Sequence, residues 1–217
     1  MFGLEVKKEL TDEDAMVRFQ NGDAQAFDLL LQRHSSGVLR FIMKMIGSRG
    51  MLQRAPTQVE DLLQEVFLKV IEKREKYDSN QKFTTWIYTI ARNRCIDYLR
   101  NEKFRRHSSL DVSLSGDESD SAVILEIIKS SDKNQEERMI NKEIQSLLNS
   151  GVEDLREEFR EVFLLREIEG LSLKEIAGIT DTNLSTVKSR LRYAYHNLRE
   201  VFIIAGYFEE RQKAKEV

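Results

Sequence analysis

The sequence predicts an all-α protein of two helical domains joined by a flexible acidic linker. One proline and ten glycines are few for 217 residues, so long helices can run without breaks. Apolar residues recur at helical spacing in successive segments, with no alternating strand pattern. A stretch rich in serine and acidic residues separates two such series of helices.

The first domain is predicted to span residues 1–107. Thr11 is placed to cap a short helix that ends near Gln20, and Asp23 is placed to cap a second, longer helix. Residues 47–57 contain the only proline and are predicted to form a loop.

Two further helices are predicted in this domain, at about 58–75 and 83–105, with a polar loop at 77–82 between them. The 58–75 helix has one apolar face. A second face carries four residues at positions i, i+3, i+4 and i+7, namely Asp61, Gln64, Glu65 and Leu68. Such a face is either solvated or meets a partner protein, and the pattern alone favours solvation.

Residues 108–134 are crowded with serine and acidic side chains and bury little apolar surface, so they are predicted to form the flexible linker. The apolar run at 123–128 is an exception, and it is a candidate for a short docking helix or strand. The second domain is predicted to span 135–208, followed by a tail at 209–217.

Four helices are predicted in the second domain. The first ends at Gly151 and the second ends near Gly170. Ser172 and Glu175 form a capping box, which predicts that the third helix starts there. The fourth runs over about 184–202.

The net charge is −3, but its distribution is uneven. Residues 82–106 carry seven bases and two acids, a local charge of +5, and residues 185–199 carry four bases and no acid. The rest of the chain is therefore strongly acidic. Two basic islands in an acidic chain indicate two separate anionic contacts or two solvated helix faces, and charge alone does not separate these readings.

The last two predicted helices form a helix-turn-helix pattern. One face of the fourth helix is apolar, with Val187, Leu191, Ala194 and Leu198. The opposite face carries Ser185, Lys188, Ser189 and Arg192. Small hydroxyl residues beside long cations suit a DNA major groove, because the helix can approach closely while the cations reach bases and phosphates. The alternative is an ordinary helical hairpin, which explains the acid-free basic run less well.

The predicted 83–105 helix interleaves cations with aromatic residues, namely Phe83, Trp86, Tyr88, Tyr98 and Phe104. Cations follow a phosphate backbone and aromatic rings stack on unpaired bases, a combination that suits single-stranded or opening DNA. Core packing of Trp86 and the tyrosines is an equally good interpretation.

No catalytic pattern is found, so we expect a protein that is not an enzyme and needs no cofactor or metal. The chain has neither a Gly-rich phosphate loop nor a Cys/His cluster with zinc spacing. The only cysteine, Cys95, lies among apolar helical positions and is expected to be a buried, inert thiol. The single cysteine and the absence of an apolar leader or 18-residue apolar run predict a cytoplasmic protein without membrane insertion.

Four motifs resemble the sigma factors of bacterial RNA polymerase. The segments Gly22-Asp23-x-x-Ala26-Phe27-x-x-Leu30, Asp61-Leu-Leu-Gln64-Glu65-Val-Phe67-Leu and Phe83-Thr-Thr-Trp86-Ile-Tyr-x-Ile-Ala91-Arg92-Asn93-x-Cys95-Ile-Asp97-Tyr98-Leu-Arg100 resemble sigma domain 2. Glu169-Gly170-x-Ser172-x-x-Glu175-Ile176-Ala177 followed by Ser185-Thr186-Val187-Lys188-Ser189-Arg190-Leu191 resembles domain 4. The chain is identified as similar to the extracytoplasmic-function (ECF) group of the sigma-70 family.

The resemblance implies an alternative sigma factor that takes core polymerase to promoters and melts the DNA. Core binding would use Asp61, Gln64, Glu65 and Leu68 on the clamp of the largest subunit, with domain 4 on the flap of the second largest. The −10 element would be bound by Asn80, Lys82, Trp86, Arg92, Asn93 and Arg100. The −35 element would be bound by Ser185, Thr186, Lys188, Ser189, Arg190 and Arg192. An anti-sigma factor is a further candidate partner, and the linker would thread toward the polymerase active-site channel.

Three features of the sequence depart from the family pattern. The 47–57 loop is longer than usual. Asp181 stands where the helix-turn-helix turn usually has glycine, and aspartate tolerates a left-handed conformation better than most residues. Tyr193 and Tyr195 replace two cations, which would weaken the phosphate contacts beside the −35 element.

Two other classes of function remain open from the residues. One is a dimeric helix-turn-helix regulator on a symmetric operator. The other is an interaction protein that binds polymerase or a regulator without using DNA. A footprint over two unlike elements, together with polymerase binding, separates the sigma factor from both.

Overall fold

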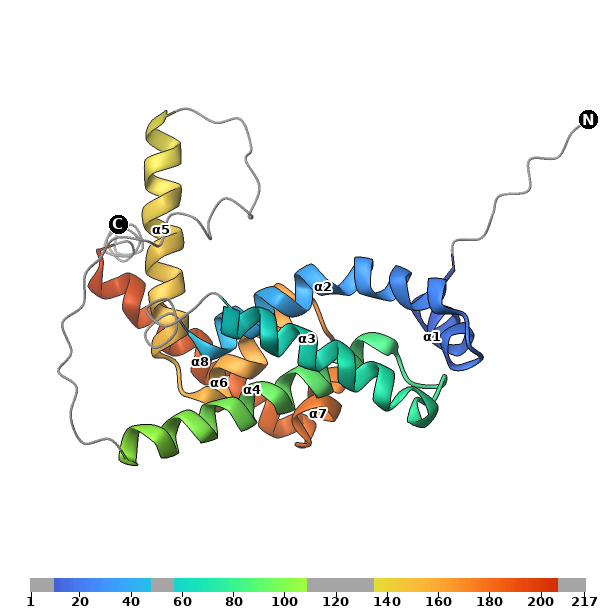
Figure 1. Ribbon diagram of the computed structural model, residues 1–217. Helices are drawn as coiled ribbons and strands as arrows, with labels where there is room; N and C mark the ends of the chain where they lie inside the picture. The colour runs from blue at the N-terminus through green and yellow to red at the C-terminus, as the bar shows by residue number, and fades with distance from the viewer. Residues whose placement is uncertain (1–9, 48–56, 109–134, 207–217) are drawn as a thin grey trace, which may run out of the picture.

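The computed structural model describes residues 10–47, 57–108 and 135–206, and every regular element within these ranges is helical, as predicted (Figure 1). The predicted linker, its apolar run at 123–128 and the tail fall outside the described residues, apart from Ser108. So does most of the 47–57 loop.

The first two helices begin at the predicted caps. Helix α1 (Asp12–Gln20) begins after Thr11, whose Oγ1 accepts a hydrogen bond from the Asp14 amide at 3.1 Å. Helix α2 (Ala24–Ile46) begins after Asp23, whose carboxylate accepts from two amides of the first turn. Each cap satisfies amides that a helix start leaves without a partner.

Helix α3 (Thr57–Glu72) ends three residues before its predicted end, because the chain tightens into the 3-10 turn η2 (Arg74–Lys76). Helix α4 (Phe83–Ser108) follows the predicted loop. That loop is polar except at its first residue. Tyr77 is buried, and the Gln20 side-chain amide donates to its carbonyl oxygen at 3.0 Å.

The prediction that Gly151 ends a helix is wrong, because helix α5 runs on to Asp154 (Gln135–Asp154). Gly151 instead allows a close approach between two helices. A Cβ at this position would lie 2.9 Å from Leu198 Cδ2 and 3.5 Å from Val201 Cγ2, both on α8 (Leu184–Ile204). The small residue therefore serves packing rather than termination.

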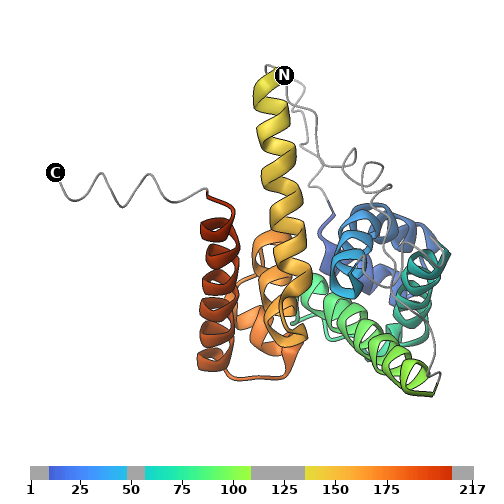
Figure 2. The same cartoon turned by 90° about the vertical axis from the view of Figure 1, so that its left-hand side faces the viewer.

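Helix α6 (Glu157–Phe163) runs into the π-helical turn η4 (Leu164–Ile168), and Gly170 then reverses the chain at φ 66°. Helix α7 (Leu173–Thr180) starts at the predicted capping box, with both of its hydrogen bonds present. Figure 2 shows α5 to α8 gathered on one side of the molecule and α1 to α4 on the other.

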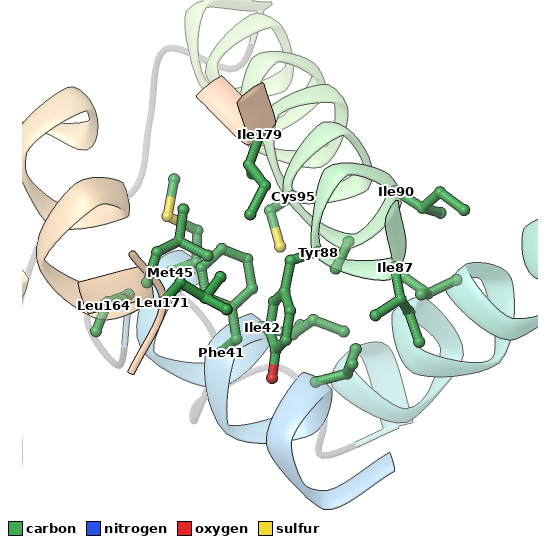
Figure 3. Close-up of a cluster of buried hydrophobic side chains, with 14 of the residues drawn as sticks. Phe41, Ile42, Met45, Ile87, Tyr88, Ile90, Cys95, Leu164, Leu171 and Ile179 are labelled. Atoms are coloured by element: carbon green, nitrogen blue, oxygen red, sulfur yellow. The ribbon is translucent and has the colours of Figure 1, made fainter. Parts of the chain in front are cut away.

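Buried apolar residues of the two halves form one continuous cluster. In Figure 3, Phe41 and Met45 of α2 and Cys95 of α4 lie close to Leu164, Leu171 and Ile179 of the second half. Helices α4 and α7 are in contact along this boundary. The two helical units therefore share a packed interface in addition to their own cores.

Candidate nucleic-acid interface

The turn between α7 and α8 has the geometry that the sequence predicts. Asp181 caps α7 in the left-handed region at φ 50° and ψ 47°, where the family pattern has glycine. Asn183 then caps α8, and its side chain accepts a hydrogen bond from the Thr186 amide at 2.8 Å. Two capped helices meeting at a short turn form a helix-turn-helix.

Helix α8 has two sharply different faces. The four residues predicted to be apolar and internal are all buried, namely Val187, Leu191, Ala194 and Leu198. Four of the six predicted −35 residues are exposed, namely Ser185, Lys188, Ser189 and Arg192. Thr186 is half-buried. The exposed four can therefore reach a ligand without any change in helix packing.

Arg190 lies apart from that face. Its Nη1 donates to Oε1 of Glu161 on α6 at 3.1 Å, and its side chain is 23% exposed. The sequence motif grouped Arg190 with the DNA-facing residues, whereas the structure pairs it with a buried carboxylate of its own half.

The predicted −10 residues lie on α4 and on the loop before it, and they differ in how exposed they are. Asn80, Lys82, Asn93 and Arg100 are exposed. Arg92 is only 18% exposed, and its Nε donates to Glu161 Oε2 at 2.7 Å. Lys82 Nζ lies 2.8 Å from Glu175 Oε1 at the start of α7. Arg92 and Lys82, both cations of the first half, are thus paired with carboxylates of the second.

The aromatic residues of α4 are mainly core residues. Phe83 and Tyr88 are buried. Trp86 is half-buried, and its ring centroid lies 5.2 Å from that of Tyr77 and 6.1 Å from that of Phe83. The structure thus favours core packing for most of this set, and leaves Trp86 partly exposed.

The face predicted on α3 is open. Asp61 and Gln64 are exposed, and Leu68 is 56% exposed, which is unusual for a large apolar residue. Glu65 differs from the other three, because it is half-buried and paired with Arg94 of α4.

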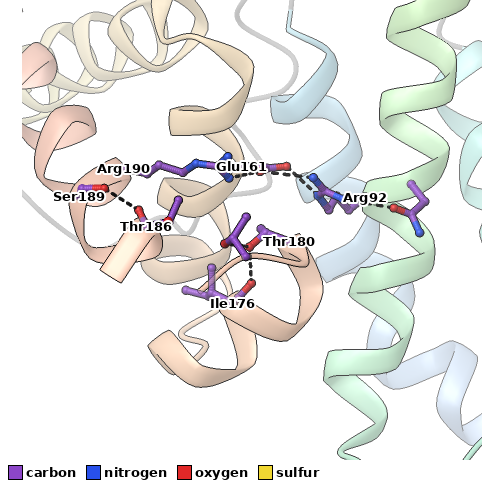
Figure 4. Close-up of polar contacts among 9 residues, drawn as sticks. Arg92, Glu161, Ile176, Thr180, Thr186, Ser189 and Arg190 are labelled. Carbon is purple, nitrogen blue, oxygen red and sulfur yellow. Dashed lines mark hydrogen bonds and ion pairs between the residues drawn. The ribbon is translucent and has the colours of Figure 1, made fainter. Parts of the chain in front are cut away.

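Glu161 was not among the residues that the sequence predicts for a site, yet it contacts one residue of the predicted −10 set, Arg92, and one of the predicted −35 set, Arg190 (Figure 4). Glu161 is 2% exposed. Burial raises its pKa, while the hydrogen bond from Arg92 and the positive charges of Arg92 and Arg190 oppose this rise. Its neighbours in sequence give no signal of this role, because its partners lie 69 and 29 positions away.

No arrangement for metal or thiol chemistry is found in the described part of the chain. Groups of His, Cys, Asp and Glu that could hold a metal ion are absent among these residues. Cys95 is fully buried, and burial raises the pKa of its thiol to about 12, which keeps it protonated. Across the same described ranges, no helix is both long and apolar enough to cross a membrane.

A helix-turn-helix unit joined to a second helical unit with a basic helix is the architecture that the resemblance to transcription initiation factors implies, and comparison with known proteins agrees. Residues 30–105 match Sigma-70 region 2, and residues 143–196 match Sigma-70, region 4. The ECF RNA polymerase sigma-E factor of Escherichia coli K12 is 31% identical over 186 residues, covering 86% of this chain and 91% of that protein. The sigma-E factor of Haemophilus influenzae is 28% identical, covering 85% and 91%.

The chain belongs to the ECF group of the sigma-70 family. It is an alternative sigma factor that directs RNA polymerase to promoter DNA. Sigma factors are generally non-catalytic initiation factors, and the family relationship does not favour the dimeric regulator on a symmetric operator.

Two solved structures share the fold. CnrH, solved in complex with the cytosolic domain of CnrY, gives a TM-score of 0.60 at 19% identity, covering 89% of this chain and 97% of that one. The sigma factor RpoE of Bartonella quintana, solved with the anti-sigma factor NepR, gives 0.61 at 20% identity, covering 82% and 97%.

Proposed function

We propose that this sigma factor binds promoter DNA with two separate surfaces and docks on core polymerase with a third. The exposed face of α8 binds the −35 element as duplex. The loop at 77–82 and helix α4 bind the −10 element as its strands separate. The exposed face of α3 binds the clamp of the largest polymerase subunit, and the α5–α8 unit contacts the flap of the second largest.

The observation that carries this proposal is the division of α8 into a buried apolar face and an exposed face of hydroxyls and cations. A recognition helix needs small residues for close approach and long cations for base edges and phosphates. Ser185 and Ser189 supply the first, and Lys188 and Arg192 supply the second. Because Asn183 already caps α8, the amide of Thr186 is satisfied before any ligand binds.

For the −10 element, Asn80 lies exposed on the loop, and its backbone amide and its side-chain amide each donate to Asp78 Oδ1 at 2.9 Å. Arg100 lies exposed further along α4. A cation and an amide at separate points suit a single strand that runs along the helix. Trp86 offers a partly accessible ring between them, and Lys82, Arg92 and Asn93 complete the surface.

The domain division that we propose follows function. Residues 1–107 bind polymerase and the −10 element, 108–134 link, 135–208 bind the −35 element, and 209–217 form a tail. The factor acts in the cytoplasm with polymerase, and an anti-sigma factor is a candidate regulator, since a sigma factor of the same fold was solved with such a partner.

The direct test is run-off transcription on genomic fragments with core polymerase, with and without this chain. We expect new, mapped start sites, each preceded by two unlike protected elements. Failure of the chain to bind core polymerase or to create new start sites would overturn the proposal. A symmetric footprint without polymerase would favour the dimeric regulator instead.

A further inference from the structure

We infer that Glu13 and Gln20 of α1 are positioning residues for the −10 element, because they fix the two ends of the 77–82 loop before DNA binds. Both act through the backbone of the loop rather than on DNA. The inference rests on the proposed function in that it takes this loop and the start of α4 as the −10 surface. It adds helix α1 to that surface, a helix for which the sequence predicts no role in DNA binding.

Gln20, the last residue of α1, holds the start of the loop. Its side-chain Nε2 donates to the carbonyl oxygen of Arg74 at 2.7 Å and to that of Tyr77 at 3.0 Å. An amide nitrogen carries two protons, and each has an acceptor here. The two carbonyls belong to the turn η2 and to the first residue of the loop. Gln20 therefore fixes the direction in which the chain leaves η2.

Glu13 holds the other end of the loop. Its Oε1 accepts from the backbone amide of Phe83 at 3.1 Å. Phe83 is the first residue of α4, and the first amides of a helix have no partner within the helix. Lys82, which precedes α4, has no acceptor in its side chain that could cap them. Glu13 supplies this acceptor from 70 positions away.

A single helix thus sets the separation between the two ends of the loop. Glu13 and Gln20 lie seven residues apart, which puts them on one face of α1 and about 10 Å apart along its axis. Asp12 anchors α1 on α2, because its carboxylate lies 2.7 Å from Arg33 Nη1 and 2.7 Å from His34 Nε2. Figure 1 shows α1 beside the turn that joins α3 to α4, and α1 contacts both η2 and α4.

Within the loop, Tyr77 connects the two fixed ends. Its ring is buried, and its hydroxyl donates to the Gln81 carbonyl oxygen at 2.6 Å. Burial, together with the negative charges of Glu13 and Asp78, raises the pKa of Tyr77, so the hydroxyl keeps its proton and remains a donor. The Tyr77 ring centroid lies 5.2 Å from that of Trp86. A shift of Tyr77 would therefore disturb Trp86 as well.

The groups proposed to meet DNA lie on or next to the segment that these contacts hold. Asn80 and Lys82 are exposed between the two fixed ends, and Trp86 is half-buried near the start of α4. A loop that is ordered in advance loses less conformational entropy when a strand binds, and it presents its side chains in one geometry. Loosening either end should therefore weaken the −10 contact and also relax its choice between bases.

The test measures run-off transcription by the full chain with core polymerase on two promoters from one mapped start site. One promoter is unchanged, and the other carries the single −10 base substitution that lowers transcription most. Gln20→Glu keeps the side-chain shape but replaces the donor with an acceptor. Glu13→Leu removes the acceptor, whereas the conservative variant Glu13→Gln keeps an acceptor oxygen. Gln32→Glu on α2 and Asp14→Leu on α1 are matched controls at exposed positions.

We expect Gln20→Glu and Glu13→Leu each to lower the ratio of product from the two promoters by about three- to tenfold. Glu13→Gln should keep most of the wild-type ratio, and both controls should keep all of it. A variant that only folds less well gives less product from both promoters and leaves the ratio unchanged. The ratio therefore reports the geometry of the loop and not the amount of folded protein.

A second measurement uses Trp86, the single tryptophan of the chain. Because its ring lies beside that of Tyr77, its quenching by acrylamide in the free chain reports how the start of the loop is ordered. Gln20→Glu should increase this quenching, whereas Gln32→Glu should leave it at the wild-type value. Circular dichroism checks that each variant keeps its helices.

An unchanged promoter ratio in folded Gln20→Glu and Glu13→Leu would overturn the inference. So would a Glu13→Gln chain that loses as much of the ratio as Glu13→Leu, because the acceptor oxygen would then have no role. Asn80→Ala separates the inference from the proposed function. If Asn80→Ala lowers the ratio and the α1 variants do not, only the role of α1 is wrong. If Asn80→Ala also leaves the ratio unchanged, the proposed −10 surface itself is wrong.

Discussion

Helices α4 and α8 carry the two basic surfaces of the molecule, yet their cations are placed very differently. On α8, Lys188 and Arg192 project from an exposed face opposite the packed one. On α4, Arg92 is held by Glu161 of the other half. Charge patterning predicts that a helix is basic, but the tertiary partners of each cation decide whether it is accessible.

The same contrast occurs within α4. Arg100 is 66% exposed, and its ion-pair partner at 4.0 Å is Asp97, a residue of the same helix. Arg92 and Arg100 therefore have the same proposed ligand, but only Arg92 is paired with the other half of the molecule. Comparing their variants should separate an effect on folding stability from an effect on DNA binding.

The largest effect is expected for Arg92→Ala. Glu161 loses one of two partners while it stays buried, so we expect the free chain to lose about 3 kcal/mol of stability in chemical denaturation. The yield of open complex, measured by the permanganate reactivity of unpaired thymines, should also fall. Arg100→Ala is the matched control: its open-complex yield should fall while its stability stays within about 0.5 kcal/mol of wild type. An Arg92→Ala chain as stable as wild type would contradict a stabilising role for the Arg92–Glu161 pair.

The α8 face is tested by Lys188→Ala and Arg192→Ala. Where the side chain contacts a base, each substitution should weaken holoenzyme binding to the −35 element by about 1–3 kcal/mol. Where it contacts a phosphate, the slope of the logarithm of the binding constant against the logarithm of the salt concentration should become shallower by about one. Folding should be unaffected, because both side chains are exposed. Arg199→Ala, further along the same helix, serves as the control. An unchanged footprint with both variants would remove these residues from the recognition surface.

Leu68→Ala tests the third surface. An exposed leucine at the C-terminal end of a polar face has no folding role, so its loss should cost about 1–2 kcal/mol of core-polymerase affinity, measured by fluorescence anisotropy, without a change in thermal stability. Leu31→Ala, an exposed leucine on α2, is the matched control. Equal affinities for the two variants would exclude α3 as the docking face.

The smallest effect concerns Glu175, which joins the α7 capping box to Lys82. Burial raises its pKa, but hydrogen bonds from Lys82 and from the Ser172 side chain and amide outweigh this, so its pKa falls from 4.5 to about 2. A carboxyl with a lowered pKa stabilises the folded state above pH 4.5, and that contribution is lost as the pH falls toward 2. The stability difference between wild type and Glu175→Gln should shrink over this range in acid titrations. A difference that stays constant down to pH 2 would contradict the pairing.

Local signals in the sequence predicted much of this fold. Thr11, Asp23 and Ser172 cap helices as expected, because capping depends on residues only two or three positions apart. The buried face of α8 follows from its 3.6-residue period. Asp181 adopts the left-handed turn that its position required.

Long-range contacts were not predictable in this way. Glu161 meets Arg92 across 69 positions, and nothing periodic connects them. Gly151 resembles a helix stop, yet it acts as a contact point for α8, because glycine serves close packing as well as termination. Sequence patterns thus located the candidate surfaces, whereas the contacts between them appear only in three dimensions.

The most direct test of the account compares how the free chain binds a −10 single strand and a −35 duplex, both taken from mapped start sites. The wild type should bind both weakly, and Glu161→Gln should raise binding to the −10 strand more than to the −35 duplex, because Arg92 loses the charged partner that holds it. Tight binding of the −10 strand by the free wild type, or no gain in the folded variant, would contradict the account.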